Sequence, residues 1–321
     1  MNTVSTTHKA ASVICNRRDF VRSTTVAGLV AGCNTLQAVE AGPETTPRVC
    51  IYTEQFQSLP IAKVCEVFQH IGVDGLDLTV RPGGHIEPKN ARAELPAAVK
   101  AARDHGLDIM MLTTGINAPN KTAEGVLAAC QDSGIDRIKL GYFGVPSQSF
   151  GKLAKLMDEV RRKLVAVAEL AAKYEVKPCI HIHSGDTMPS NGFMVYDLIR
   201  DMPTDRIGAY LDSHHMTVTG GAGGWRQAID LLTPWISLVA LKNSQWRPVE
   251  RDNTGQQRWR IEYCRLEDGI APIADFVSTV EKVGYRGFYT LHTEYKRPVE
   301  DCIQLTTDDF RFLQKVFARL S

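Results

Sequence analysis

The chain of 321 residues lacks several features that mark common functional classes. Its 37 basic residues nearly balance its 36 acidic ones, which leaves a formal charge of +1 and no basic excess for nucleic acid. Its eight cysteines include no CxxC pair, which argues against a zinc ribbon. No glycine-rich phosphate loop follows the first predicted strand, where "YTEQFQSL" stands, and this argues against an open dinucleotide-binding sheet.

The chain also lacks an apolar run of the roughly 20 residues that a membrane-spanning helix needs. The mildly apolar run Val26–Cys33 is too short, but it follows Arg17, Arg18 and an apolar pair. This pattern resembles a twin-arginine export leader and predicts a leader and linker over residues 1–41 and a periplasmic protein. Ordinary cleavage near Ala41 is the favoured interpretation. The alternatives are a lipoprotein box with a lipid anchor at Cys33 and a chance arginine pair.

Six cysteines remain in the body of the chain, at positions 50, 65, 130, 179, 264 and 302. Several of them lie within apolar runs, which predicts buried free thiols. Disulfides are the alternative that an exported protein allows.

What the sequence has instead is a regular alternation of short β-rich apolar runs and longer helical patterns after a linker. The predicted strands are Val49–Thr53, Gly75–Val80, Asp108–Thr113, Arg137–Tyr142, Lys177–His183, Ile207–Asp212, Ile236–Lys242 and Gly287–His292. Predicted helices include Pro60–His70, Glu94–His105, Thr122–Ser133, Lys152–Tyr174, Trp225–Leu232 and Ile273–Val283. Eight such units predict a single (β/α)8 barrel over residues 48–321. Gly72, Gly106, Gly134 and Gly284 supply the expected helix ends.

Two glycine- or tryptophan-containing segments fall between the elements. "TGGAGG", residues 219–224, is predicted to be a flexible loop, with an anion cradle as the alternative. Residues 244–270 are predicted to form an irregular active-site lid, because they are long, charged and rich in tryptophan. Within it, Trp246 and Trp259 either stack on a sugar face or pack the loop.

In a (β/α)8 barrel the functional site lies at the carboxyl ends of the strands, and alternation decides which side chains point inward there. "CIHIHSGD" at the fifth strand directs Cys179, His181 and His183 inward, whereas Ile180 and Ile182 face the helices. The other inward or end positions are Asp212, His214 and His215 at the sixth strand, Lys242 at the seventh, and His292 and Glu294 at the eighth. Such a density of titratable groups predicts an active site.

At the second strand, "DLTVRPGGHIEP" places Arg81 and His85 at the rim. Arg81 is predicted to bind a substrate carboxylate, phosphate or hydroxyl. The alternative is a structural ion pair between Asp77 and Arg81.

The chain resembles the xylose isomerase-like TIM-barrel superfamily of sugar isomerases and epimerases. The segments that carry the resemblance are "GVDGLDLTVRPGGH", "HIHSGD", "LDSHHMTVTGG", "LVALKNSQW" and "LHTEY". The resemblance implies a divalent metal held by Glu, Asp, His and Glu on the fifth to eighth strands. Asp212 matches the sixth-strand ligand and His215 matches a substrate-contacting histidine. His181, Ala240 and His292 stand at the other three positions, with Glu294 two residues further on.

The sequence therefore predicts a carbohydrate isomerase or epimerase. Its predicted catalytic residues are Asp212, Glu294, His181 and Lys242, and its predicted substrate-binding residues are Arg81, His85, His183, His215 and Trp246. A metal site of His181, Asp212, His292 and Glu294 would suit Mn, Zn, Fe or Co. The alternatives are a lyase or hydratase acting on keto-sugars and a sugar-binding barrel without activity. The expected partner is a small carbohydrate, with no nucleic acid and no membrane span; a homo-oligomer is left open.

Overall fold

The computed structural model describes residues 46–146 and 150–320. The predicted leader, its twin arginine and Cys33 lie outside the described residues, so export and lipidation stay predictions.

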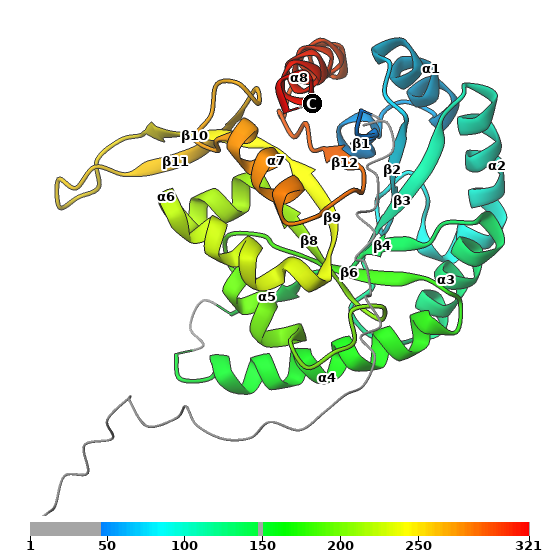
Figure 1. Ribbon diagram of the computed structural model, residues 1–321, viewed down its shortest axis with the longest axis horizontal. Coiled ribbons are helices and arrows are strands. Elements are labelled where there is room, and N and C mark those ends of the chain that lie inside the picture. Colours follow the sequence, from blue (N-terminus) through cyan, green and yellow to red (C-terminus); the bar gives the residue numbers. More distant parts are fainter. Residues whose placement is uncertain (1–45, 147–149, 321) are drawn as a thin grey trace, which may run out of the picture. The chain divides into compact units, whose positions relative to one another are not determined.

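Eight parallel strands close into a barrel in the order β1-β2-β3-β4-β6-β8-β9-β12, with β12 pairing back to β1 (Figure 1). Their bounds are β1 Val49–Tyr52, β2 Gly75–Val80, β3 Asp108–Thr114, β4 Arg137–Lys139, β6 Lys177–His181, β8 Gly208–Asp212, β9 Ile236–Leu241 and β12 Tyr289–Leu291. The predicted (β/α)8 barrel is confirmed.

Helices follow the strands and cover the outside of the barrel (Figure 1). They are α1 Ile61–Ile71, α2 Ala91–Asp104, α3 Lys121–Ser133, α4 Leu153–Ala172, α5 Gly192–Ile199, α6 Ser213–Leu232, α7 Ile273–Lys282 and α8 Val299–Leu320. The short 3-10 turns are η1 Thr53–Phe56, η2 Pro88–Asn90 and η3 Thr233–Trp235. Gly72, Gly106, Gly134 and Gly284, predicted to end helices, have φ of 92°, 71°, 73° and 93°, which glycine adopts without steric cost.

The interior of the barrel is filled by the strand residues that the period-two pattern predicts to point inward. Met111, Cys179, Tyr210, Leu238 and Ala240 form a buried cluster inside the barrel. The alternate residues, among them Ile180 and Ile182, join the larger core between strands and helices. Because these side chains fill the barrel, a substrate cannot pass through it and binds at the carboxyl ends of the strands.

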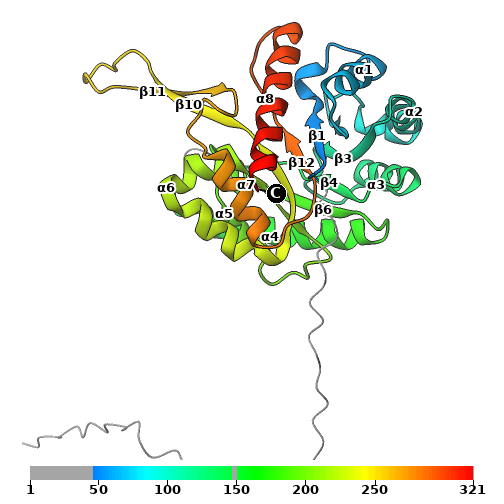
Figure 2. The ribbon, with the colours of Figure 1, turned by 45° about the horizontal axis from the view of Figure 1, so that its top comes forward.

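Two segments differ from their predictions. Most of residues 244–270 is a regular hairpin, β10 Asn243–Pro248 with β11 Trp259–Cys264, and it projects away from the barrel (Figures 1 and 2). The predicted irregular lid is therefore wrong. "TGGAGG" lies within α6, which kinks at Gly221 (φ 56°); the loop prediction missed that Asp212 caps a helix beginning at Ser213.

A second, shorter ribbon joins β5 Phe143–Gly144 to β7 Thr187–Met188. Among the described residues all six cysteines are free, and five of them are buried, as expected for the body of the chain. None of the described helices is long and apolar enough to cross a membrane.

Candidate active site

Asp212 is the last residue of β8 and also the N-cap of α6. Its Oδ1 accepts the backbone N–H of His215 at 2.9 Å, so the strand end and the helix start fix this carboxylate. Oδ2 is left to face the barrel axis, where it lies 3.4 Å from Nε2 of His181. Burial opposes ionisation of Asp212, but His215 and Lys242 outweigh it and hold the pKa of the carboxyl well below its usual range.

His181 is the last residue of β6, and its ring is oriented by Tyr142. The Tyr142 hydroxyl lies 2.8 Å from Nδ1, while Nε2 has no hydrogen-bond partner and is buried. Burial lowers the pKa of His181 to about 3, so the imidazole is neutral at pH 7. A neutral imidazole with one free nitrogen is the form that binds metals.

His292 follows β12, and buried polar groups contact its Nε2. Its Nε2 lies 2.9 Å from the Tyr210 hydroxyl and 3.6 Å from Oδ2 of Asp77, and its ring stacks on Tyr52. Burial lowers the pKa of His292, but Asp77 and Glu294 more than compensate and raise it. Nδ1 is buried without a hydrogen-bond partner and lies 3.7 Å from Glu294 Oε1.

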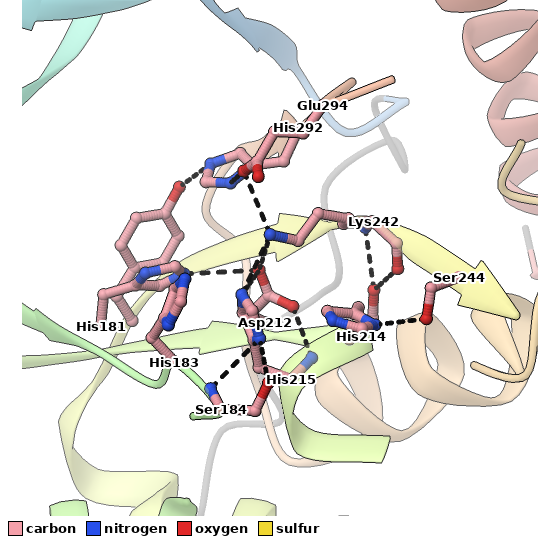
Figure 3. A network of polar contacts seen from close by, with 12 residues as sticks. His181, His183, Ser184, Asp212, His214, His215, Lys242, Ser244, His292 and Glu294 are labelled. Atoms are coloured by element: carbon pink, nitrogen blue, oxygen red, sulfur yellow. Dashed lines mark hydrogen bonds and ion pairs between the residues drawn. The ribbon is translucent and has the colours of Figure 1, made fainter. Parts of the chain in front are cut away.

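The donor atoms of His181, Asp212 and His292 all lie within 4.8 Å of one another. Figure 3 shows these three side chains pointing toward the same region of the mouth. The unpartnered buried atoms of the described residues include one from each: His181 Nε2, Asp212 Oδ2 and His292 Nδ1. Buried polar atoms normally have partners, and two imidazoles with one carboxylate suit Zn, Fe, Mn or Co. These three residues therefore fit a divalent metal ion.

Lys242 and Glu294 lie beside the metal-binding group. Lys242 Nζ is 3.1 Å from Glu294 Oε1, 3.0 Å from His215 Nε2 and 3.9 Å from Asp212 Oδ2. Burial raises the pKa of Glu294, but Lys242 and His292 outweigh it and lower the pKa. Glu294 is therefore an ionised carboxylate, and its 20% side-chain exposure leaves it open to a substrate.

The other histidines complete one wall of the mouth (Figure 3). His183 is half-buried, and its ring is tilted by 39° against that of His215 with the centroids 4.1 Å apart. Burial lowers the pKa of both imidazoles. His214 Nδ1 lies 2.8 Å from the Ser244 hydroxyl at the root of the hairpin. His183 is the more exposed of the two, whereas His215 is buried, with Nδ1 bonded to Ser184 and Nε2 to Lys242. The substrate-binding roles of both stay predictions.

Arg81 lies at the opposite wall. It forms an ion pair with Glu54, so the alternative pairing with Asp77 is wrong; Asp77 instead accepts a hydrogen bond from Thr113 at 2.7 Å. His85 is bonded to Thr79 Oγ1 and the Phe56 carbonyl, which ties the loop after β2 to η1.

Trp246 lies on the hairpin with 46% of its surface exposed. Its register partner is Ile261, and it is two residues beyond Ser244, which touches the site. The substrate-binding roles of Trp246 and His85 stay predictions.

Sequence reasoning missed the aromatic and charged groups that support the imidazoles. These are Tyr52, Glu54, Lys139, Tyr142 and Tyr210. Alternation gave a signal for two of them. In "RIK" it puts Lys139 inward when Ile138 faces the helices, and in "YLD" it puts Tyr210 on the same face as Asp212.

The model of the family described as xylose isomerase-like TIM barrel matches residues 65–316. The chain belongs to this family. Three solved structures with the same fold illustrate it. The 3-keto-D-glucoside 4-epimerase of E. coli has 14% identity and a TM-score of 0.62, covering 84% of this chain and 99% of that one. D-psicose 3-epimerase of Clostridium cellulolyticum, solved with D-tagatose, has 12% identity, a TM-score of 0.60 and coverage of 84% and 99%.

The third is the IolI protein with a bound zinc atom, at 14% identity, a TM-score of 0.62 and coverage of 85% and 99%. No protein of curated function matches the chain. At these identities the solved structures establish the fold and leave the reaction to the site itself.

The donor set of this barrel differs from the one that the resemblance implies. Ala240 stands where the resemblance implies a histidine, and it is packed in the interior cluster with Tyr210. Lys242, two residues further along the same face of the strand, reaches the carboxylates instead. The site thus combines three residues that could hold a metal with a buried ammonium.

Proposed function

We propose that this protein is a carbohydrate isomerase or epimerase that moves a proton on a carbon next to a sugar carbonyl. The proposal rests on one observation: a group of residues that could hold a metal and an ion pair that could move a proton lie side by side in the mouth of the barrel. Three unpartnered donor atoms of His181, Asp212 and His292 lie beside an ionised Glu294 that is paired with Lys242. The sugar epimerases with the same fold support the substrate class.

The formal charges of the mouth agree with this chemistry. Four carboxylates line it against three cations: Glu54, Asp77, Asp212 and Glu294 against Arg81, Lys139 and Lys242. A divalent metal bound by His181, Asp212 and His292 would reverse the sign of this imbalance, polarise the carbonyl and favour negative charge on its oxygen.

The residues of the chain supply the proton transfer. Glu294 Oε1 accepts the proton from the substrate carbon, and Lys242 Nζ donates a hydrogen bond to the neighbouring oxygen as charge develops there. In isomerisation the protonated Glu294 returns a proton to the adjacent carbon; in epimerisation the same carbon regains a proton on its opposite face. When Lys242 turns from Glu294 to the substrate, the carboxylate loses its cation and becomes a stronger base. His183, whose pKa is lowered by burial, binds a hydroxyl group of the sugar, and the buried His215 positions Lys242 through its Nε2.

The test is proton exchange in D2O, followed by 1H NMR, with D-fructose, D-psicose, D-tagatose and a 3-keto-D-glucoside as probes. We expect deuterium at a carbon next to the carbonyl together with an epimer or isomer. Glu294→Gln should slow the exchange by about 100-fold or more, whereas Glu159→Gln on the outer helix α4 should not.

The rival functions give different products. Exchange accompanied by loss of the glycosidic group would make the protein a lyase, because elimination begins with the same proton abstraction. Binding of a probe without exchange on any of them would contradict an enzymatic function and favour a sugar-binding barrel.

A further inference from the structure

Lys139 is a buried lysine that the proposed mechanism does not use. It ends β4, and only 4% of its surface is exposed. Because Ile138 belongs to the core under the helices, alternation directs Lys139 to the barrel axis. Among residues 46–146 and 150–320, no carboxylate forms an ion pair with its ammonium group. Its close contact is the ring of Tyr142, whose centroid lies 3.6 Å from Nζ.

The contrast with Lys242 shows what Lys139 lacks. Lys242 is equally buried but lies between Glu294 and Asp212. An ammonium group in a protein interior is costly without an anion nearby. Burial, and then the charge of Arg81, lower the pKa of Lys139 to about 7, and the more distant carboxylates of Asp77, Glu294 and Glu54 offset this only in part. An anionic ligand would supply the missing partner.

Lys139 also lies close to the metal-binding group. The Tyr142 ring that contacts its Nζ carries the hydroxyl bonded to His181. Arg81 has the same relation to the second imidazole. Its guanidinium lies 5.9 Å from the ring centroid of Tyr52, and the Tyr52 ring stacks on His292. Each of the two imidazoles thus contacts a tyrosine ring, and each ring has a cation over it.

We propose that Lys139 and Arg81 form a subsite for a carboxylate group of the substrate, which makes the substrate a sugar acid. The proposal deepens the proposed function, because it names the substrate class of that same site. Only 4% of the Lys139 surface is exposed, so an anion that reaches its ammonium group must be compact. A uronate carboxylate is planar and takes the place of C6 itself, whereas the phosphate of a sugar 6-phosphate is bulkier and is attached beyond C6.

Calorimetric titration of the purified full chain tests the subsite without requiring turnover. The probes are D-glucuronate and D-galacturonate against D-glucose and D-galactose, which differ from them by the carboxylate, and D-glucose 6-phosphate. We expect each uronate to bind at least about tenfold more tightly than its neutral counterpart, since a charged hydrogen-bonded pair contributes 1.5–3 kcal/mol. Lys139→Met should abolish this preference, and Lys155→Met on the exposed surface of α4 should retain it.

Lys139→Gln, which keeps a hydrogen-bond donor without the charge, and Arg81→Gln serve as second variants if Lys139→Met does not fold. Equal affinity for acids and neutral sugars in the parent protein would overturn the proposal. A preference that survives in folded Lys139 variants would also overturn it, as would tighter binding of the phosphate than of D-glucuronate. Uronate preference without proton exchange on any sugar would contradict the proposed function alone; exchange without uronate preference would contradict the subsite alone.

Discussion

The ammonium nitrogen of Lys242 lies 3.1 Å from Oε1 of Glu294, deep in the mouth of the barrel. This ion pair connects the seventh and eighth strands of the barrel. It also lowers the pKa of Glu294 against the effect of burial. Removal of the ion pair should therefore lower the free energy of unfolding and also reverse the direction in which that free energy changes with pH.

We predict that Lys242→Met lowers the free energy of unfolding at pH 7 by about 3–5 kcal/mol, because it leaves buried carboxylates without their cation. In the parent protein, Glu294 and Asp212 have lowered pKa values. Their stabilising contribution is therefore complete above the ordinary carboxyl range and is lost as the pH falls below it.

In Lys242→Met, burial dominates and raises these pKa values, so the difference from the parent should grow as the pH rises from 4 to 7. Thermal unfolding measured across that range checks the prediction, with Lys63→Met in an exposed ion pair as the control. A difference that stays constant with pH would contradict it.

Asp77 is predicted to position His292 for metal binding. Its Oδ2 lies 3.6 Å from His292 Nε2, the nitrogen opposite the unpartnered Nδ1. Carboxylates behind a metal-binding histidine typically contribute 10–100-fold in affinity, so Asp77→Asn should lower zinc affinity by about that factor. The amide oxygen can still accept from Thr113. Competition with a chromophoric chelator measures the affinity, and Asp104→Asn on α2 should leave it unchanged.

Much of this site follows from local sequence patterns. Alternation in "CIHIHS" correctly directs Cys179 and His181 inward, because a strand packed on both faces keeps period two. The same rule places Lys242 and His292 at the mouth. The contacts across the barrel do not follow, because residues far apart in the chain meet only after closure. Arg81, for example, forms its ion pair with Glu54, whereas the local sequence suggested Asp77 as its partner.

The hairpin was also missed, for a physical reason. Residues 244–270 carry charged and aromatic residues on both faces, so they lack the apolar alternation of a half-buried strand. The hairpin is held at its base by Asn243, whose side chain bonds Ser244 N, Leu266 O and both backbone groups of Ala271.

We predict that Asn243→Ala lowers the free energy of unfolding by at least about 3 kcal/mol, because each buried backbone group left unpaired costs about 1–3 kcal/mol. Chemical denaturation gives the value. Asn253→Ala, near the exposed tip of the same hairpin, is the matched control and should change stability little. Equal effects of the two variants would mean that the hairpin base contributes no special stability.

The most direct test of the account is the metal content of the full chain, measured by mass spectrometry after purification without added metal or chelator. We expect about one equivalent of a divalent metal, as a single closed donor set predicts. The metal should be lost in His181→Ala, Asp212→Asn and His292→Ala and retained in Glu294→Gln, because Glu294 is not among the three residues whose donor atoms converge. If the parent binds no metal after incubation with manganese, zinc, iron or cobalt, or if the three variants keep it, these residues do not form a metal site.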